Sequence, residues 1–377
     1  MSIDRIPFNR PFSTGDELAF IADAMARGHL SGDGHYTKEA SQLLREITRS
    51  HSVLLTTSCT HALEMSALLL EVGRGDEVIM PSFTFVSTAN AFLLRGAAPV
   101  FVDIREDTLN IDERLVERSV TARTKAIVVV HYAGVACEMD AISAIAEQHG
   151  LVIIEDNAHG LGATYRGREL GTIGSLATLS FHETKNVHCG EGGALLVNDS
   201  SFLERAEVLR EKGTNRSRFF RGQVDKYTWI DVGSSYLPSE ILMAFLTAQL
   251  RSFASIQQRR MHIWARYHAE LSAHAATYGW QLPSIPPHVT HPAHLFWLQV
   301  RDLGERQRLL SHLDANGVHA VFHYVPLHNS PQGRRFGEVE LPITSSTSDR
   351  LIRLPLYPDL DDHDVDRIVT SVISFES

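Results

Sequence analysis

The sequence has few cysteines, no long apolar run and no excess of basic residues. Its three cysteines, Cys59, Cys137 and Cys189, are an odd number without CxxC spacing, which indicates reduced thiols and neither a disulfide framework nor a zinc knuckle. No stretch approaches the roughly 20 uncharged apolar residues of a membrane-spanning helix. The start, MSIDRIPFNRPFS, lacks the apolar segment of a signal peptide. We therefore expect a cytoplasmic protein.

Metal and nucleic-acid binding are also disfavoured. The formal net charge is -10 and the lysines and arginines are scattered, so a polyanion is not an expected partner. The 20 histidines include no HExxH motif and no tight His/Asp cluster in the sequence, so we expect no bound metal. No GxGxxG follows the first strand-like run, which disfavours a nicotinamide-dependent sugar oxidoreductase.

Periodicity predicts an α/β protein. Short β-branched runs alternate with segments of helical period, and several runs lack apolar/polar alternation, as expected for largely parallel strands covered by helices on both faces. A single central sheet therefore organises the larger part of the chain. The predicted strands are Val53 to Thr57, Glu77 to Met80, Val100 to Asp103, Ala126 to Val130, Val152 to Glu155, Thr178 to Phe181 and Ala194 to Val197.

The length of 377 residues exceeds the usual size of one hydrophobic core, and the pattern changes after about residue 250. We expect a large domain, residues 1–250, and a smaller α+β domain, residues 251–377. The elements predicted for the second domain are a helix from Gln249 to His274, strands at His294 to Val300 and His319 to Tyr324, and a closing helix near Asp362 to Ser374.

Polar residues that suit a phosphate follow the first predicted strand. In TTSCTHALEMSALLL, residues 56–70, the strand ends in Ser58, Cys59 and Thr60 and an apolar helix begins at once. The free N–H groups and positive dipole of a helix start attract anions, although Ser and Thr also cap ordinary helices. Both interpretations stay open for this segment taken by itself.

Two further segments also lie just past strand ends, where open α/β sheets bind ligands. In VIIEDNAHG, Asp156 is placed to keep a pyridine nitrogen protonated or to cap the next turn, and His159 to bond a ring hydroxyl. In LSFHETKNVHCGEGGALLV, Lys185 lies in a Gly-rich loop, where partial desolvation makes a lysine nucleophilic. Ser180, just before this loop, offers a hydroxyl group to the predicted phosphate site. An isolated lysine of this kind is usually a solvated surface charge.

Taken together and in this order, these segments resemble the sugar aminotransferases of the DegT/DnrJ/EryC1/StrS family, which are fold-type I pyridoxal-phosphate (PLP) enzymes, aspartate aminotransferase-like in fold. The resemblance covers nearly the whole chain. It rests on SCTHALEMSALLL, GDEVIMPSFTFVSTANAFLLRGA, FVDIREDTLNID, EDNAHG, GTIG, SFHETKN, GEGG and VFHYVPLH.

The resemblance implies a role for each matching position. Lys185 is the Schiff-base lysine, Asp156 the partner of the pyridine nitrogen, and His159 the neighbour of the ring hydroxyl. Phe85 matches the aromatic that stacks on the ring, although a buried strand-end aromatic is the competing account. The positions that match the phosphate site are Cys59, through its backbone, Thr60 and Ser180, with Ser58 beside them.

The retained Lys185 favours transamination, because some relatives have His at this position and act as sugar dehydratases. The chain departs from the family at GSSYLPSE, where Ser235 and Leu237 replace polar residues that many relatives lend to the neighbouring subunit's cofactor. The resemblance implies a homodimer with shared active sites, but this departure leaves the cross-subunit contact in doubt.

The expected substrate is a dTDP-linked keto sugar, with L-glutamate as amino donor. The segments HYAGVACEMD, FHETKN, REKGTNRS and FFRGQVDKYTW are especially similar to family members that aminate dTDP-4-keto-6-deoxyglucose. Members that form the 4-amino-4,6-dideoxyglucose epimer or a 3-amino sugar are the alternatives.

Diphosphate recognition requires cations, and the stretch from Arg210 to Tyr236, a predicted long excursion, is the only dense basic stretch. A solvated loop is the alternative. The predicted substrate-binding residues are Lys212, Arg216 and Arg221 from this stretch, and His323, Tyr324 and His328, which match a family segment lining the sugar pocket. A core or interface role for His323 stays open.

Overall fold

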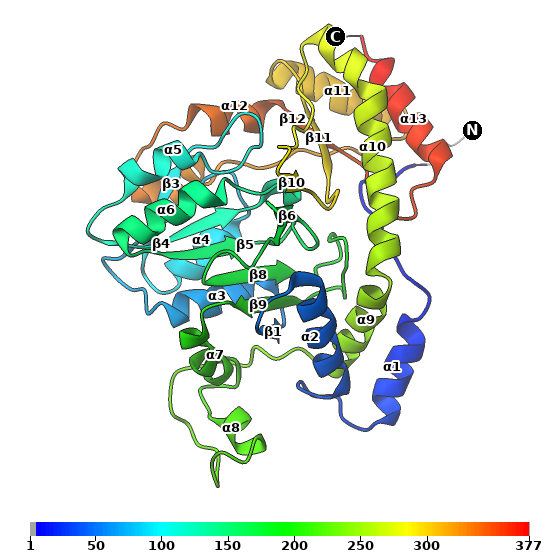
Figure 1. The fold of residues 1–377 in the computed structure, drawn as a ribbon. Helices are drawn as coiled ribbons and strands as arrows, with labels where there is room; N and C mark the ends of the chain where they lie inside the picture. The colour runs from blue at the N-terminus through cyan, green and yellow to red at the C-terminus, as the bar shows by residue number, and fades with distance from the viewer. Residues whose placement is uncertain (1–4, 377) are drawn as a thin grey trace.

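The computed structural model describes residues 5–376. Its centre is a seven-stranded sheet in the order β1-β9-β8-β5-β4-β2-β3 (Figure 1). Among these strands only β9 runs antiparallel to its neighbours, so the sheet is mixed and mostly parallel, as predicted. The bounds are β1 (Val53–Thr56), β2 (Glu77–Pro81), β3 (Ala98–Val102), β4 (Thr124–Val130), β5 (Val152–Asp156), β8 (Leu176–Ser180) and β9 (Gly193–Val197), each within two residues of the prediction.

Helices cover both faces of this sheet. On β2, Val78 and Met80 pack into one apolar cluster while Ile79 between them packs into another, because successive side chains point to opposite faces. This explains the lack of alternation in the strands. One face carries α3 (Cys59–Leu69), α4 (Val86–Leu93) and α7 (Leu203–Arg210); the other carries α1 (Glu17–Ala26), α2 (His35–Thr48), α6 (Met139–His149) and α9 (Glu240–Arg251).

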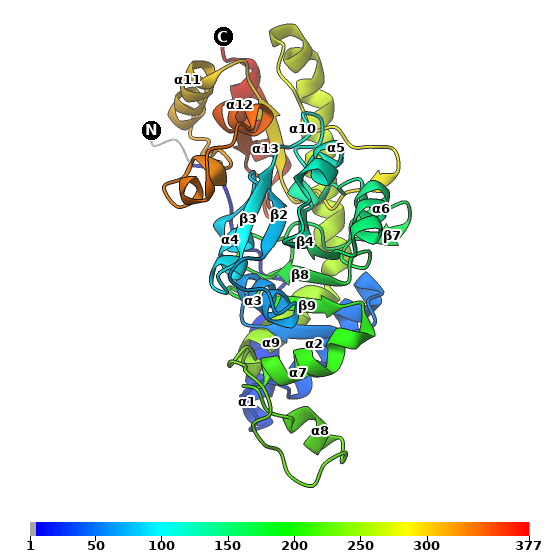
Figure 2. The same ribbon diagram turned by 90° about the vertical axis from the view of Figure 1, so that its left-hand side faces the viewer.

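The remaining elements are short or belong to the C-terminal part. They are α5 (Glu113–Val116), β6 (Thr164–Tyr165), β7 (Arg168–Glu169), α8 (Arg216–Phe220), α10 (Phe253–Tyr278), β10 (Val289–Thr290), β11 (Phe296–Gln299), α11 (Leu303–Ala315), α12 (Pro342–Arg350), β12 (Leu351–Leu354) and α13 (Asp362–Ile373). The segment that carries α8 projects from the foot of the molecule in both ribbon views, which confirms a long excursion (Figures 1 and 2).

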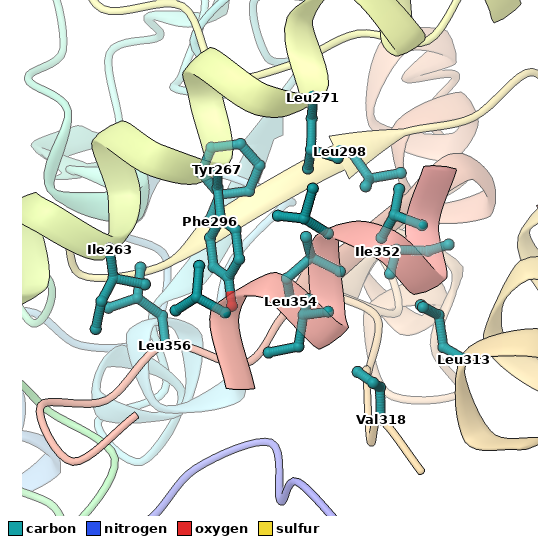
Figure 3. Packing of buried hydrophobic residues seen from close by; sticks show 14 of the residues in the cluster. Ile263, Tyr267, Leu271, Phe296, Leu298, Leu313, Val318, Ile352, Leu354 and Leu356 are labelled. Carbon is teal, nitrogen blue, oxygen red and sulfur yellow. The ribbon is translucent and has the colours of Figure 1, made fainter. Parts of the chain in front are cut away.

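A separate apolar cluster lies between α10, α11, α13 and the β11–β12 pair (Figure 3). Tyr267, Phe296 and Leu354 are fully buried in it. The N-terminal residue Ile6 joins the same cluster, and its N–H donates to the Gly317 carbonyl at 2.8 Å. We propose that this cluster is the core of the predicted domain 251–377, with the chain near Ile6 added to it.

Two details differ from the sequence prediction. The helix predicted from Gln249 to His274 is two helices, since α9 ends at Arg251 and α10 begins at Phe253. The strand predicted from His319 to Tyr324 does not form within residues 5–376; the segment makes one isolated bridge, between Val321 and Arg353. A single bridge does not require polar and apolar residues to alternate, so the sequence of this segment carries little information about its pairing. None of the helices described is long and apolar enough to cross a membrane.

The expectation that no tight His/Asp cluster exists is corrected at the start of α13. Asp361, His363 and Asp364 hold potential ligand atoms within 4.8 Å of one another. Asp361 accepts the backbone N–H of Asp364, and Asp364 pairs with Arg367 at 2.9 Å, so these carboxylates already serve the helix. The cluster lies outside the cavity described next.

Candidate active site

A cavity of about 430 Å³ lies at the carboxyl edge of the sheet, within the usual size range of small-molecule sites. Strands β1, β2, β5 and β8 all end there, because parallel strands share this edge. Every predicted cofactor-binding residue lines this one cavity: Ser58, Cys59, Thr60, Phe85, Asp156, His159, Ser180 and Lys185.

Lys185 lies in the loop that joins the antiparallel neighbours β8 and β9. The loop is closed at its base, where the Phe181 N–H donates to the Gly192 carbonyl at 2.8 Å. Asn186, next to the lysine, donates its side-chain amide to the Pro292 carbonyl at 2.8 Å and so fixes the loop against the C-terminal part. Burial lowers the pKa of Lys185 to about 8, partly opposed by Cys59 and Asp156. More of the amine is therefore uncharged near neutral pH than in an exposed lysine, and the uncharged form is the nucleophile.

Asp156 is a buried carboxylate at the end of β5. Thr88 donates its hydroxyl to Asp156 Oδ2 at 2.8 Å, and the Ala158 N–H reaches Oδ1 at 3.3 Å. Burial raises the pKa of Asp156, whereas these hydrogen bonds and the charge of Lys185 lower it. Asp156 thus caps the turn, as the alternative interpretation holds, and also faces the cavity.

His159 has a defined tautomer. Its Nδ1 accepts the Ala133 N–H at 3.3 Å, so the proton of the neutral ring lies on Nε2. Burial holds the pKa of His159 well below its ordinary value, which keeps the ring neutral. The ring stacks on His294 at 4.2 Å between centroids, and His294 Nδ1 bonds Asn186 Oδ1 at 2.9 Å. His159 therefore presents a fixed N–H donor.

The start of α3 lines one part of the cavity and has features that suit an anion such as a phosphate. Ser58 caps this helix, since its hydroxyl accepts the His61 N–H at 3.1 Å. The N–H groups of Cys59 and Thr60 make no hydrogen bond within residues 5–376. Gly193 is packed so closely that a Cβ there would collide with the backbone of Ser58 and Cys59. Unpaired N–H groups at a helix start form a ready anion site.

Phe85, His323 and Tyr324 also line the cavity. Phe85 precedes α4 and is 59% exposed, which rules out a buried strand-end aromatic. His323 and Tyr324 line the cavity, with their rings stacked at 3.8 Å. His323 Nδ1 also bonds the Tyr132 hydroxyl at 3.2 Å. His328 does not line the cavity; it is buried and its Nδ1 bonds the Ser82 hydroxyl at 2.7 Å.

The basic residues of the excursion are not brought to this cavity by the chain's own fold. Arg216 pairs with Glu211 at 3.4 Å, and Arg221 pairs with Glu207 at 2.8 Å. Lys212, Ser235 and Leu237 also lie outside the lining. Their contact with substrate or with a neighbouring cofactor stays a prediction.

Several lining residues were missed by the sequence analysis. Thr84, Ser87 and Thr88 belong to PSFTFVSTAN, where polar residues in the first turn after a buried strand were the available signal. Arg353 interrupts the apolar run LIRLPLY, which is an unusual place for a cation. His294 gave no signal in the sequence, because its role depends on its stacking partner.

This arrangement fits PLP. Free N–H groups for a phosphate, a buried acid, a fixed N–H donor and an amine with a pKa of about 8 line one cavity. Fold and site together define the class, a fold-type I PLP-dependent aminotransferase.

Comparison with known proteins identifies the family. The model of the DegT/DnrJ/EryC1/StrS aminotransferase family matches residues 13–373, and the chain belongs to this family, whose aminotransferases use PLP. The chain is similar to the aminotransferase TlmJ from Streptoalloteichus hindustanus, with 31% identity, 98% of both chains covered and a TM-score of 0.90. Membership decides against the nicotinamide-dependent alternative.

Two further solved structures are similar. DesV from S. venezuelae, solved with a ketimine intermediate, is 31% identical over 99% of this chain and 100% of its own, with a TM-score of 0.89. The putative sugar aminotransferase Spr1654 from Streptococcus pneumoniae, in its apo-form, is 28% identical over 98% and 97%, with a TM-score of 0.91. Spr1654 has also been solved in PLP and PMP forms.

Proposed function

We propose that this enzyme transfers the amino group of L-glutamate to dTDP-4-keto-6-deoxy-D-glucose, giving dTDP-4-amino-4,6-dideoxy-D-galactose and 2-oxoglutarate. The observation that carries the transamination is Lys185, with its pKa of about 8, in one cavity with the buried Asp156. The choice of sugar is supported by the segments HYAGVACEMD and FFRGQVDKYTW, which are especially similar to enzymes of that reaction.

Each residue of the cavity has a task in this proposal. When bound, PLP supplies an aldehyde for attachment and a pyridine ring that accepts the electron pair left by the departing proton. Asp156 holds the proton on the pyridine nitrogen, and His159 Nε2 donates to the ring hydroxyl. The N–H groups of Cys59 and Thr60 bind the phosphate, together with the Ser180 hydroxyl, while the ring of Phe85 stacks on the cofactor.

Lys185 is also the proton carrier. Its amine removes the proton from Cα of glutamate in the first half-reaction and delivers a proton to C4 of the sugar in the second. Because Lys185 approaches from one side, it determines the configuration of the new amino group. The two halves share one active site, so we expect ping-pong kinetics.

We propose a cytoplasmic homodimer in which the excursion of one subunit reaches the other subunit's site. The support is that Phe220 and Trp229 of the excursion are 69% and 77% exposed. In the dimer, Lys212, Arg216 and Arg221 bind the diphosphate, and His323 and Tyr324 form the sugar side of the pocket; His328, whose ring bonds Ser82, is not part of it.

The decisive experiment for the substrate is incubation of the holoenzyme with dTDP-4-keto-6-deoxyglucose and L-glutamate, followed by NMR of the product. We expect an axial 4-amino group. An equatorial amino group indicates the 4-amino-4,6-dideoxyglucose epimer, and amination at C3 requires a 3-keto substrate; either result overturns this substrate assignment but leaves transamination standing.

The attachment of the cofactor is tested by borohydride reduction of the holoenzyme and peptide mass mapping. We expect a pyridoxyl group on Lys185, and Lys185→Ala to abolish turnover while still binding pyridoxamine phosphate. Lys125→Ala, at an exposed site at the amino end of β4 and outside the cavity, is the control. An adduct on another lysine, or normal turnover by Lys185→Ala, refutes the assignment.

A further inference from the structure

Two stacked histidines line the same cavity as Lys185. His159 follows β5, His294 lies two residues before β11, and their ring centroids are 4.2 Å apart. The hydrogen bond of His159 Nδ1 leaves the proton on Nε2, so this ring offers a donor to the cavity. What His294 offers depends on which of its two nitrogens carries the proton.

Asn186 determines the tautomer of His294. The side-chain Nδ2 of Asn186 donates to the Pro292 carbonyl at 2.8 Å and lies 3.3 Å from Oε1 of Gln257. With Nδ2 facing two oxygen acceptors, the other end of the amide is Oδ1, which accepts and does not donate. His294 Nδ1 lies 2.9 Å from this oxygen and therefore carries the proton.

The other ring nitrogen of His294, Nε2, is consequently an acceptor. Burial holds the pKa of His294 well below its ordinary value, and the charges of His159 and Lys185 lower it further, so the ring is neutral. Within residues 5–376, Nε2 has no hydrogen-bond partner, and the ring lines the cavity. Because a buried acceptor without a partner is costly, this nitrogen calls for a ligand that donates to it.

We propose that His294 Nε2 accepts a hydrogen bond from the sugar hydroxyl on the carbon next to the ketone, and that His294 thereby selects the sugar. This inference rests on the proposed function, in which the ketone is at C4. One neighbour of C4 is C3, which carries a hydroxyl, and the other is C5, which carries the methyl group. The hydroxyl bound by His294 is therefore that of C3.

The chemistry of the two substrates favours the sugar over the amino donor. Once the amine of L-glutamate is engaged in transfer, the rest of that molecule offers carboxylate oxygens, which are acceptors and are repelled by the lone pair of Nε2. A keto sugar carries hydroxyls that donate. Since one cavity takes both substrates in turn, an acceptor in its lining serves the sugar.

The connection of His294 to the lysine loop favours a hydroxyl near the reacting carbon. Asn186, which holds the His294 ring, directly follows Lys185 in the chain. The charge of Lys185 also acts on the His294 ring. In the proposed function Lys185 delivers a proton to C4, so groups around this amine face C4 and its neighbours rather than the diphosphate or the base.

The test measures each half-reaction separately, in single turnovers of the holoenzyme followed by the cofactor absorption. The amino form of the enzyme, prepared with L-glutamate, is mixed with dTDP-4-keto-6-deoxyglucose or with its 3-deoxy analogue. His294→Phe and His294→Leu have no acceptor, and the first keeps a flat ring on His159. His294→Gln restores an acceptor oxygen. His268→Phe is the matched control, since this ring stacks on Trp264 outside the cavity.

We expect the wild type to favour the 3-hydroxy sugar over the 3-deoxy analogue by about 5- to 150-fold in rate constant divided by dissociation constant, the effect of leaving a buried acceptor unpaired. His294→Phe and His294→Leu lose this preference, because their reaction with the 3-hydroxy sugar slows. Their reactions with the 3-deoxy analogue and with L-glutamate stay within about twofold of the wild type. His294→Gln keeps part of the preference, and His268→Phe keeps all of it.

Two results overturn the inference. One is a preference for the 3-hydroxy sugar that stays within about twofold of the wild type in whichever of His294→Phe and His294→Leu folds. The other is an equal slowing of both half-reactions, which limits His294 to supporting the ring of His159. Failure of the proposed function is seen in the wild type itself, which then does not aminate the 3-hydroxy sugar at C4. The choice of the C3 hydroxyl falls with that result, whereas the first two results leave the substrate assignment standing.

Discussion

Thr88→Val is expected to slow amino transfer, because it removes a hydrogen bond to the carboxylate of Asp156. The Thr88 hydroxyl donates to Asp156 Oδ2 at 2.8 Å in a buried setting, and valine keeps the shape of threonine. A hydrogen bond to a charged group contributes about 1.5–3 kcal/mol, and about 1.4 kcal/mol corresponds to one pKa unit or tenfold in rate. Loss of this donor therefore raises the pKa of Asp156 and slows the glutamate half-reaction by about 10- to 150-fold.

The sign of the pH effect follows from the same contacts. Burial already raises the pKa of Asp156, and the Thr88 hydroxyl opposes this rise. Without the hydroxyl the carboxylate takes up a proton at higher pH. The acid limb of the plot of rate against pH therefore shifts to higher pH. The assay is single-turnover conversion of the holoenzyme by L-glutamate, followed by the cofactor absorption at several pH values.

Thr84→Val is the matched control. The Thr84 hydroxyl bonds the Thr88 hydroxyl at 2.8 Å and has no bond to Asp156. We expect a loss well below that of Thr88→Val. Equal losses in the two variants, or a Thr88→Val profile that coincides with the wild type, refute the assigned role of this hydrogen bond.

Three further predictions concern the lysine, the sheet edge and the phosphate end. Because burial lowers the pKa of Lys185 to about 8, the rate at which the apoenzyme forms its covalent PLP adduct rises with pH through a midpoint near 8; a midpoint near that of free lysine contradicts the burial. Glu155 is buried and accepts His131 Nε2 and the N–H groups of Gly171, Ile173 and Gly174, so Glu155→Ala lowers the free energy of unfolding by about 3–5 kcal/mol in urea titrations. Burial raises the pKa of Glu155, but these partners lower it below its ordinary value; the deficit of the variant is therefore full at neutral pH and shrinks on acidification, whereas a deficit independent of pH contradicts the charged contact. In Gly193→Ala the added Cβ collides with the backbone of Ser58 and Cys59 and displaces the start of α3. We expect PLP binding to the apoenzyme to weaken by at least about tenfold in fluorescence titrations, and an unchanged affinity would contradict the assigned role of this helix start.

The cofactor end of the site was predictable because its signals are local. Ser58 and Asp156 each stand directly after a predicted strand, Lys185 follows another by four residues, and parallel strands end at one edge. Their chemistry was therefore readable from neighbours in sequence, and the resemblance to a family ordered the pieces. The structure brings them to one cavity as expected.

The part of the cavity lining that comes from residues beyond 290 was less predictable, because it depends on packing between distant segments. Arg353 reaches the cavity through the pairing of β12 with β11 and the bridge to Val321, neither of which has a short-range signature. The same holds for His294, whose function depends on stacking against His159. His328 is the opposite case. A family motif predicted that it lines the pocket, but its ring bonds the Ser82 hydroxyl outside the cavity.

The crossing of the N-terminal segment to the C-terminal cluster has a consequence for chimeric enzymes. Ile6 packs with the core around β11 and β12, and Phe8 covers Arg353. The Phe12 carbonyl accepts from Gln249 and His188, which belong to the other part of the chain. A graft of residues 251–377 from a relative is therefore expected to pack poorly against Ile6 and Phe8 unless residues 5–12 are exchanged with it, so the C-terminal part is best exchanged as two pieces that are discontinuous in the gene.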